Sequence, residues 1–479
     1  MEKNKLYKFG ILVLVLVVIS VYAYPKIKLF DSKKEVLNQN NDFHYTAGHL
    51  KELAEMKNKL NVVLIVLDTV RPDHLSCYGY KRETSPNIDK LAEEGTLFTN
   101  AFTVIPYTTA SHISLMTSIY PFVYQPRMPN AQATGVVVVE DEYLTLAEIL
   151  KTVGYKTAAF ISVSMMSPAS GLNQGFDVYN YSEGVRRGNE TIIAANIWLE
   201  NNYEEPFFLW VHSYDPHDPY NQPKPFDSMH EDFELYYDNV SLSDFTALKQ
   251  AITNYDEDIS YGDKYIGLLL DKIKDLGLNN NTLIVFLSDH GEQFGEHLVP
   301  IYQGMGPQVV FEHARTLYDQ EVRIPFIIKG PGIPKDKKID ALVENIDVMP
   351  TILNLLNIPV STNIQGKSTL PLIKNKSSEI RSFVFTHLYP IISPYYRSSI
   401  RTKDYKLIYD HYNKESQLFN LKKDPQEQIN IYEQNKTLTQ EYEHLMIKLI
   451  EEHTESTEIA IHQIESSEAK KLEELGYII

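Results

Sequence analysis

Asn61-Val-Val-Leu-Ile-Val-Leu67 is an unbroken apolar run of strand length, and a carboxylate, Asp68, follows it directly. Strands that are covered on both faces of a parallel sheet have this composition, because neither face meets water. Open α/β sheets bind their ligands at the carboxyl ends of such strands. The run therefore predicts a central strand of an α/β fold and makes Asp68 a candidate ligand, with a helix cap as the alternative role.

Two later runs of the same kind also lead to polar side chains. Phe207-Phe-Leu-Trp-Val211 leads into a loop in which two prolines flank His217 and keep the backbone extended. A histidine held in this way loses little entropy when it contacts a substrate, although an ordinary surface histidine fits the same pattern. Thr282-Leu-Ile-Val-Phe-Leu287 is followed, after one serine, by Asp289 and His290, which are both ligand-type side chains.

Helical patterns alternate with these strands from Ser85, over Leu144–Val153 and over Asp244–Leu276, and a further apolar strand covers Ile324–Ile328. The alternation predicts a mostly parallel, doubly wound sheet with helices on both faces. We therefore predict an α/β domain over residues 59–379.

The pattern changes near residue 380 to short strand-like segments with polar turns. They predict a C-terminal α+β subdomain over residues 380–479 with a short antiparallel sheet. The segments are Ser398–Arg401, Lys406–Tyr409 and Gln417–Leu421, and a charged helix follows from Leu438.

The stretch Thr108-Thr109-Ala110-Ser111-His112 opens a helical pattern that continues through Met116. A hydroxyl in the first turn of a helix faces unpaired backbone N–H groups and the positive end of the helix dipole. That setting lowers the cost of an alkoxide and attracts an anion. Thr108 is therefore the candidate nucleophile, and His112, one turn further on, is a second candidate catalytic residue. The alternative is that Thr108 or Thr109 only caps the helix.

The composition is that of an ordinary globular chain, with a formal net charge of -18 over 479 residues. Nucleic-acid-binding proteins normally present a basic face, so this acidic balance argues against a nucleic-acid partner. A single cysteine, Cys77, excludes internal disulfides and cysteine metal clusters. The sequence leaves the oligomeric state open.

The amino terminus predicts export. Three lysines precede an uncharged, apolar run over residues 9–25, which is at the short end of the roughly 17–25 residues that span a bilayer. We predict a cytoplasmic basic tip over residues 1–8, a single membrane anchor over residues 9–25 and a tether over residues 26–58, with the remaining chain outside the cytoplasm. Val21-Tyr22-Ala23 is a passable cleavage site, so a signal peptide and a secreted protein are the alternative.

The predicted element ends offer Asp68, Thr108, Asp289 and His290 together. Two carboxylates, an imidazole and a hydroxyl oxygen can hold one divalent cation, which would lower the pKa of the hydroxyl and polarise an ester oxygen. Basic side chains nearby would neutralise the oxygens of a phosphoryl or sulfuryl group. Each feature is common alone, but their joint occurrence predicts a metal-dependent site for such esters.

Further motifs extend along the chain. They are Leu67-Asp68-Thr-Val-Arg71-Pro-Asp73, Ser85-Pro-Asn-Ile-Asp-Lys-Leu-Ala92, Asp215-Pro-His217-Asp-Pro-Tyr220, Ser288-Asp289-His290-Gly291-Glu292, Arg323-Ile-Pro325, Ile346-Asp347-Val-Met-Pro350-Thr, Ile400-Arg401-Thr-Lys-Asp-Tyr-Lys406-Leu and Leu475-Gly-Tyr-Ile. Over roughly residues 60–479 the chain resembles the sulfatase branch of the alkaline phosphatase superfamily. The resemblance implies an alkaline phosphatase-like sheet sandwiched by helices.

The sequence departs from the sulfatase pattern where the chemistry takes place. A typical sulfatase reads Cys/Ser-x-Pro-Ser-Arg, and its first residue is oxidised to formylglycine. Here that residue is Thr108, a secondary alcohol that cannot become this aldehyde, and the proline and arginine are missing. Thr69 replaces the second aspartate of the usual Asp-Asp pair, and Asp289-His290 replaces the Asp-Asn pair of calcium sulfatases. The departures resemble the phosphoesterases and membrane-associated phosphotransferases of the superfamily.

The resemblance also implies a cofactor and further roles. One divalent metal ion is expected at the four side chains named above, and the imidazole ligand favours manganese or zinc, with magnesium or calcium as alternatives. His217 and a basic group from His313 or Arg315 would contact the charged oxygens of the substrate. His313 could also serve as the general acid for the leaving alcohol.

We therefore expect an extracytoplasmic, metal-dependent hydrolase or transferase that acts on phosphate or sulfate esters through Thr108. A sulfatase that works without formylglycine is the second hypothesis. A non-catalytic binding protein on a sulfatase scaffold is the third.

Overall fold

The computed structural model describes residues 59–124, 137–139, 143–228, 245–299, 308–309, 312–360, 364–389 and 396–454. The predicted basic tip, membrane segment and tether lie outside these ranges, as does the motif at Leu475. Within the ranges, no helix is both long enough and apolar enough to cross a membrane. The anchor over residues 9–25 therefore stays a prediction.

β1 (Asn61–Leu67) is buried along its whole length inside an eight-stranded sheet. Its neighbours, β5 (Phe207–Ser213) and β6 (Thr282–Leu287), both run parallel to it. The strand order is β10-β2-β9-β6-β1-β5-β3-β4. The other strands are β2 (Thr96–Phe102), β3 (Lys156–Ile161), β4 (Val178–Tyr181), β9 (Arg323–Lys329) and β10 (Lys337–Glu344). Only β9, among these described strands, runs antiparallel to its neighbours, so the predicted mostly parallel sheet is confirmed.

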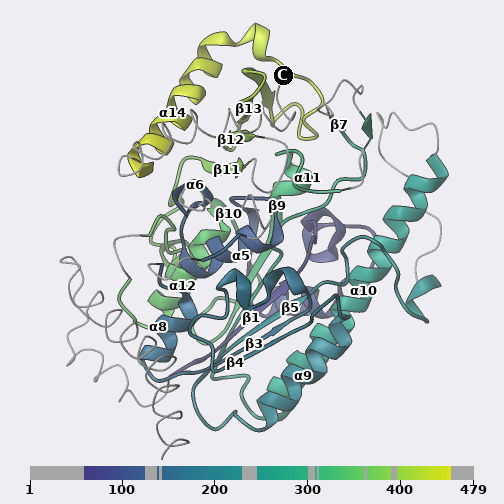
Figure 1. Cartoon of the computed structure of the whole chain (residues 1–479), viewed down its shortest axis with the longest axis vertical. Helices are drawn as coiled ribbons and strands as arrows, with labels where there is room; N and C mark the ends of the chain where they lie inside the picture. Colours follow the sequence, from purple (N-terminus) through teal and green to yellow (C-terminus); the bar gives the residue numbers. More distant parts are fainter. Residues whose placement is uncertain are drawn as a thin grey trace, which may run out of the picture. The chain divides into compact units, whose positions relative to one another are not determined.

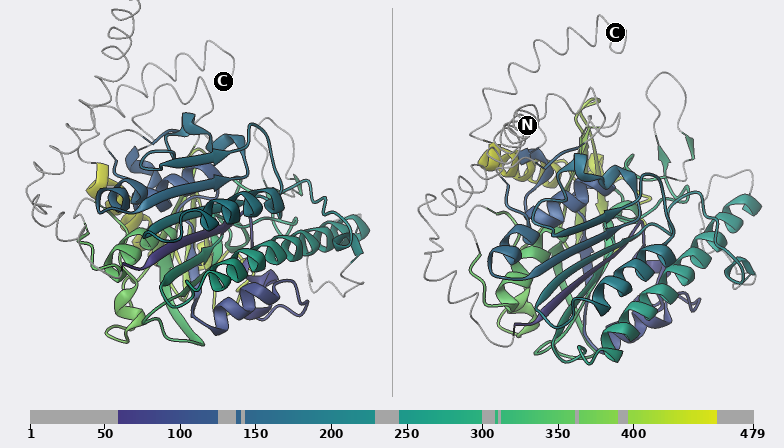
Figure 2. Two further views of the ribbon diagram at one scale, coloured as in Figure 1. Left: turned by 90° about the horizontal axis from the view of Figure 1, so that it is seen from below. Right: turned by 60° about the horizontal axis from the view of Figure 1, so that its bottom comes forward.

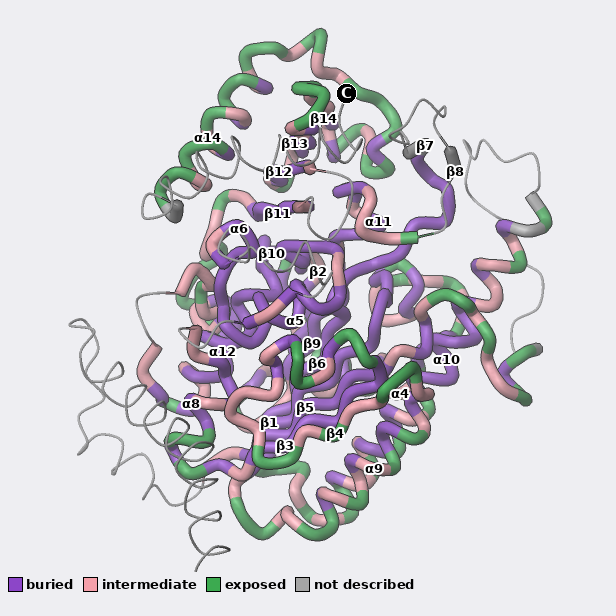
Figure 3. Tube along the Cα trace, in the orientation of Figure 1, coloured by how far each residue is buried: buried purple, intermediate pink, exposed green. Residues whose placement is uncertain are grey.

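Helices cover both faces of this sheet (Figures 1 and 2). Val63 and Leu67 of β1 share one core cluster with Ile192 of α9 and Ile259 of α10. Figure 3 shows that the central strands β1, β5 and β6 are buried between the helical layers. The helices are α4 (Pro86–Glu93), α5 (Thr108–Thr117), α6 (Pro121–Tyr124), α8 (Leu146–Thr152), α9 (Gly188–Glu200), α10 (Phe245–Asp275), α11 (Asp319–Val322), α12 (Val348–Leu355), α13 (Leu370–Ile373) and α14 (Lys436–Thr454).

A separate antiparallel sheet has the order β11-β12-β13-β14, which confirms the predicted small sheet. Lys406 of this sheet is completely buried, and its ammonium lies 2.8 Å from a carboxylate oxygen of Asp319 and 2.8 Å from one of Glu427. These ion pairs join the small sheet to α11. Its strands are Val384–Leu388, Arg397–Arg401, Tyr405–Asp410 and Glu415–Asn420, and a two-stranded ribbon is formed by β7 (Leu298–Val299) and β8 (Gln308–Val309).

Some elements were not predicted from the sequence. Residues 166–188, which contain no apolar run of strand length, include β4 at the edge of the large sheet. The side chains of β4 alternate between exposed and half-buried. Edge strands in contact with water lack a continuous apolar run, so hydrophobicity alone does not reveal them.

Candidate active site

The carboxyl ends of β1 and β6 bring Asp68 and Asp289 together. These strands are neighbours, with Val66 opposite Leu287, so the residues that follow them meet at one edge of the sheet. Thr69 has a φ of 57°, which is a rare conformation for a β-branched residue. Its backbone N–H donates to Asp289 Oδ1 over 3.2 Å, so this strained residue ties the two strand ends to each other.

His290 directs the lone pair of one ring nitrogen toward the Asp68 and Asp289 carboxylates. Its Nδ1 lies 3.0 Å from the carbonyl oxygen of Gly291. A carbonyl only accepts, so Nδ1 carries the proton and Nε2 is left with a lone pair. This Nε2 lies 3.2 Å from Thr108 Oγ1, 3.4 Å from Asp289 Oδ2 and 3.8 Å from Asp68 Oδ1.

These oxygens suit a cation. Asp68 Oδ1 and Asp289 Oδ2 are buried and have no hydrogen-bond partner within the described part of the chain. Asp68, Asp289 and His290 each offer a ligand atom, and these atoms lie within 4.8 Å of one another. Buried unpaired carboxylate oxygens are costly unless an ion or a proton satisfies them. The residues present therefore fit a divalent metal ion.

The charges of the two carboxylates are unequal. Burial and the nearby Asp289 carboxylate raise the pKa of Asp68 well above its ordinary value. Burial alone would also raise the pKa of Asp289, but the imidazoles of His290, His112 and His212 outweigh it and hold that pKa low. Without a cation the pair therefore favours a proton on Asp68, and a bound cation would replace this proton.

Thr108 occupies the first turn of α5, as the sequence indicated. The N-cap is Tyr107, with extended backbone, so Thr108 is already inside the helix and is free of the capping role. Its side chain is buried, and its hydroxyl lies beside His290 as described above. The hydroxyl of Thr109 instead donates to the carbonyl of Met165 over 3.3 Å. Of the two neighbouring threonines, Thr108 has its hydroxyl beside the candidate metal ligands.

His112 lies within the protein interior and is completely buried. Its Nδ1 lies 2.7 Å from the carbonyl oxygen of Thr108, so Nδ1 donates to the first turn of its own helix. Burial and the nearby His212 lower the pKa of His112 to about 3, which makes the ring neutral. His212, at the end of β5, lies 3.2 Å from Asp68 Oδ2 through Nε2. The sequence does not identify His212 as a candidate ligand, because a single histidine next to an apolar run fits packing as well as binding.

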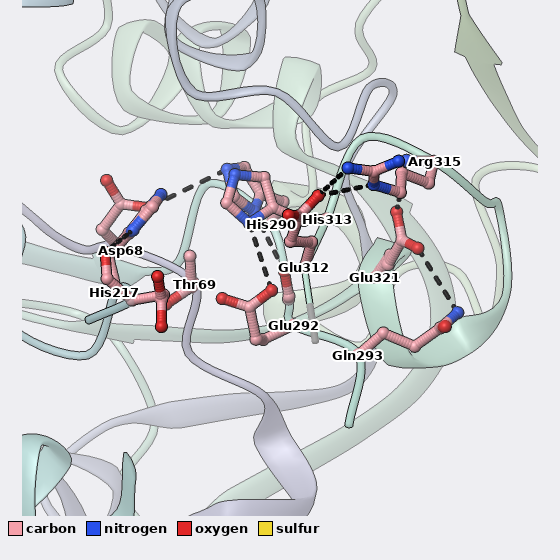
Figure 4. Close-up of polar contacts among 12 residues, drawn as sticks. Asp68, Thr69, His217, His290, Glu292, Gln293, Glu312, His313, Arg315 and Glu321 are labelled. Atoms are coloured by element: carbon pink, nitrogen blue, oxygen red, sulfur yellow. Dashed lines mark hydrogen bonds and ion pairs between the residues drawn. The ribbon is translucent and has the colours of Figure 1, made fainter. Parts of the chain in front are cut away.

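His217 and His313 form a second group beside His290 (Figure 4). Their ring centroids are 4.8 Å apart, and His313 lies 4.3 Å from the His290 ring. His217 Nδ1 is held by the carbonyl of Asp218 at 2.7 Å and the hydroxyl of Tyr214 at 2.8 Å. The other ring nitrogen of His217, Nε2, is therefore available to a ligand.

Glu292 is the residue that holds His313. Its Oε1 lies 3.2 Å from His313 Nδ1, and its side chain is completely buried. Burial raises the pKa of Glu292 to about 7 and lowers that of His313 to about 4. Glu292 belongs to the motif around Asp289, but its role could not be predicted from the sequence.

Arg315 is placed differently from the histidines. Its guanidinium pairs with the carboxylate of Glu312, and Figure 4 shows this pair on the side of His313 that faces away from Asp68. The backbone N–H of Arg315 donates to Glu321. His313 is therefore better placed than Arg315 to reach the substrate of the candidate site, and the role of Arg315 stays a prediction.

Comparison with known proteins places this arrangement in a family. The family described as Sulfatase matches residues 60–358, and the family described as N-sulphoglucosamine sulphohydrolase, C-terminal, matches residues 308–455. The chain belongs to the sulfatase family. As sulfatase-family proteins generally bind a divalent metal, the carboxylate and imidazole group at β1 and β6 is where this sulfatase-family hydrolase would bind one.

Similar proteins agree with this assignment. An ulvan-active sulfatase of Formosa agariphila is 30% identical over 393 residues, which cover 74% of this chain and 73% of that protein. An arylsulfatase of Clostridium perfringens is 25% identical over 460 residues, covering 78% and 90%. The phosphonate monoester hydrolase of Agrobacterium radiobacter shares the fold, with a TM-score of 0.68 at 19% identity over 82% of this chain and 96% of that one.

Proposed function

We propose that this sulfatase-family protein is a metal-dependent hydrolase or transferase of phosphate esters that uses Thr108 Oγ1 as its nucleophile. The observation that carries the proposal is the position of this hydroxyl. It lies in the first turn of α5, 3.2 Å from His290 Nε2, next to the unpaired oxygens of Asp68 and Asp289.

The proposed metal ligands are Asp68, Asp289, His290 and Thr108. A divalent ion at these residues would lower the pKa of the Thr108 hydroxyl and polarise an ester oxygen. One imidazole among oxygen ligands favours zinc or manganese, with magnesium or calcium as alternatives.

Backbone and side-chain groups of the protein carry out the remaining steps. The N-terminal turn of α5 directs backbone N–H groups toward the anionic group that Thr108 attacks. His217 and His313 contact the non-bridging oxygens, because the His313 ring lies beside His290 and the His217 ring beside His313. Glu292 fixes the His313 ring through Nδ1. The negative charge of a bound ester would raise the pKa of this ring from its low value of about 4, so that Nε2 can carry a proton to the leaving oxygen. Water, or an acceptor alcohol, then resolves the covalent threonine ester.

The chemistry of threonine favours phosphate over sulfate. A formylglycine hydrate has a second hydroxyl that can expel a sulfate group, whereas a threonine ester has none. The Thr108 ester must therefore be resolved by external attack at phosphorus or sulfur. A sulfatase that works in this way without formylglycine is the second candidate, and the 30% identity with an ulvan-active sulfatase favours it.

Parallel assays separate the candidates. The metal-loaded protein is incubated with an aryl phosphate, an aryl phosphodiester and an aryl sulfate, and acid-quenched samples are analysed by peptide mass spectrometry. We expect turnover of a phosphate ester and a phosphoryl adduct on Thr108. Thr108→Ala should lose both, and Thr109→Ala is the matched control. Full activity of Thr108→Ala contradicts the proposal, and sulfate turnover alone supports the second candidate.

A non-catalytic scaffold would give a different result. It would show no turnover of any of the three ester classes and no adduct, even when metal is bound. Retention of the candidate ligands Asp68, Asp289 and His290 in one cluster argues against this third possibility.

The location is a separate proposal. Lysines followed by the apolar run over residues 9–25 support a single membrane anchor with the catalytic domain outside the cytoplasm. Protease treatment of intact cells should degrade the domain, and protection from protease would contradict an external location. Recovery of the protein in the medium would support the secreted alternative.

A further inference from the structure

A second group of potential ligands lies on another side of Asp289. His112 of α5, His212 of β5 and Asp289 each offer a ligand atom, and these atoms lie within 4.8 Å of one another. All three side chains are buried, at 0%, 0% and 1% exposure. The rings of His112 and His212 meet edge to face, with centroids 4.9 Å apart.

Each member of this group has a buried polar atom that no part of the described chain satisfies. These atoms are Nε2 of His112, Nδ1 of His212 and Oδ2 of Asp289. Unsatisfied buried atoms of this kind are rare in folded proteins, and three in mutually contacting residues point to a missing partner.

The hydrogen bonds of the two histidines are those of metal ligands. His112 donates through Nδ1 to the Thr108 carbonyl, and His212 donates through Nε2 to Asp68 Oδ2. Each imidazole therefore has one nitrogen fixed by a protein oxygen and one nitrogen left bare. Metal-ligating histidines typically show this pattern, because the fixed N–H orients the ring and makes the other nitrogen more basic.

Asp289 can serve both groups. Its Oδ1 already accepts N–H groups from Thr69 at 3.2 Å and from His290 at 3.0 Å. Its Oδ2 has no hydrogen-bond partner among the described residues and lies 3.4 Å from His290 Nε2. The same oxygen lies 3.9 Å from His112 Nδ1, so the His112 ring, whose Nε2 is bare, packs beside it. Ligand bonds of roughly 2.0–2.2 Å in a tetrahedral zinc site place ligand atoms ~3.4 Å apart. The ligand atoms of His112, His212 and Asp289 lie within 4.8 Å of one another before any ion draws them together.

We propose that the chain binds a second divalent cation, zinc, at His112, His212 and Asp289, adjacent to the ion at Asp68, Asp289 and His290. Two imidazoles and one carboxylate suit zinc better than magnesium or calcium, which prefer all-oxygen ligands. The second ion would fix the first turn of α5 and offset the negative charge of Asp289. This proposal goes beyond the proposed function, because the second ion needs no contact with a substrate.

The test counts ions and does not depend on activity. The metal-free wild-type protein is titrated with zinc by calorimetry, and bound zinc after dialysis is measured by mass spectrometry. We expect two ions per chain. The His112→Gln and His212→Gln variants should each bind one, whereas His387→Gln, which alters a buried histidine of the small sheet, should still bind two. Circular dichroism verifies that each variant is folded.

The outcomes separate this proposal from the proposed function. One zinc per wild-type chain, lost in His290→Ala but kept in His212→Gln, overturns the second site and leaves the first intact. Two ions in both His112→Gln and His212→Gln also overturn it. Two ions in the wild type without turnover of any ester would support the second site and contradict the proposed function. If both glutamine variants fail to fold, the wild-type titration alone still decides between one ion and two.

Discussion

Asp289→Asn is the most informative single change, because Asp289 is shared by both groups of ligands. The asparagine Oδ1 can keep the N–H groups of Thr69 and His290 that now donate to Asp289 Oδ1. The new amide nitrogen would stand where Oδ2 now lies, 3.4 Å from the lone pair of His290 Nε2. The change therefore keeps the shape and the hydrogen bonds while it removes one buried negative charge.

The effect of Asp289→Asn on the free energy of unfolding depends on whether metal is present. Without metal, the free energy of unfolding should change by no more than about 1 kcal/mol, because no buried donor or acceptor loses its partner. With metal at a thousandfold excess over its Kd, the wild type should gain about 4 kcal/mol. For a domain of several hundred residues, at about 2 cal/mol/K per residue, this gain raises the Tm by about 5 °C.

Thermal unfolding with and without zinc or manganese measures both quantities. The wild type should show the metal-dependent rise in Tm, and Asp289→Asn should lose it. Asp263→Asn is the control, since Asp263 is equally buried but accepts N–H groups at the start of α4. That variant should lower the Tm and still respond to metal. The reasoning is refuted if Asp289→Asn keeps the full metal response, or if no divalent ion stabilises the wild type.

Three further predictions concern other residues. Glu292→Gln should lower kcat about 10- to 100-fold, the usual effect of removing a carboxylate that orients a functional histidine; steady-state kinetics will measure this, and an unchanged kcat contradicts the role of Glu292. Lys406→Met should lower the free energy of unfolding by about 3 kcal/mol, because Glu427 stays buried without its cation. Urea denaturation measures this loss, with the half-exposed Lys403→Met as control. Burial and the nearby His411 lower the pKa of His387 to about 3, below the ordinary 6.5, so the unfolded state takes up the proton first as the pH falls. The stability lost should reach about 2 kcal/mol for this group at pH 5, and His387→Gln should be less sensitive to acid in urea unfolding at pH 7 and pH 5.

The position of the site could be predicted from the sequence because its residues follow uninterrupted apolar runs. Asp68 follows β1 and Asp289 follows β6, so two ligands could be located before their contact was known. The antiparallel direction of β9 could not be predicted from the sequence, because parallel and antiparallel buried strands have the same apolar composition. His212 was hidden for a related reason: it stands inside the strand β5, where polar residues are usually explained by packing.

Contacts between individual side chains could not be predicted from the sequence. The role of Glu292 depends on its distance from His313, which lies 21 residues later in a different loop. Similarly, the sequence placed Arg315 and His313 together as possible substrate contacts. Only the structure distinguishes them, because Arg315 pairs with Glu312, whereas the His313 ring lies tilted beside the His290 ring with centroids 4.3 Å apart.

The departures from the usual sulfatase pattern are linked to each other in space. Thr108 Oγ1 lies 3.2 Å from His290 Nε2, and His112 donates to the carbonyl of Thr108 itself. Thr69, which stands in place of the usual second aspartate, donates its backbone N–H to Asp289 Oδ1. A site that had lost its function would accumulate unrelated changes that leave cavities or broken partnerships. Here Thr69, Thr108, His112 and His290 each contact another of these four residues or a candidate ligand, which supports the proposal of a different nucleophile and a different metal.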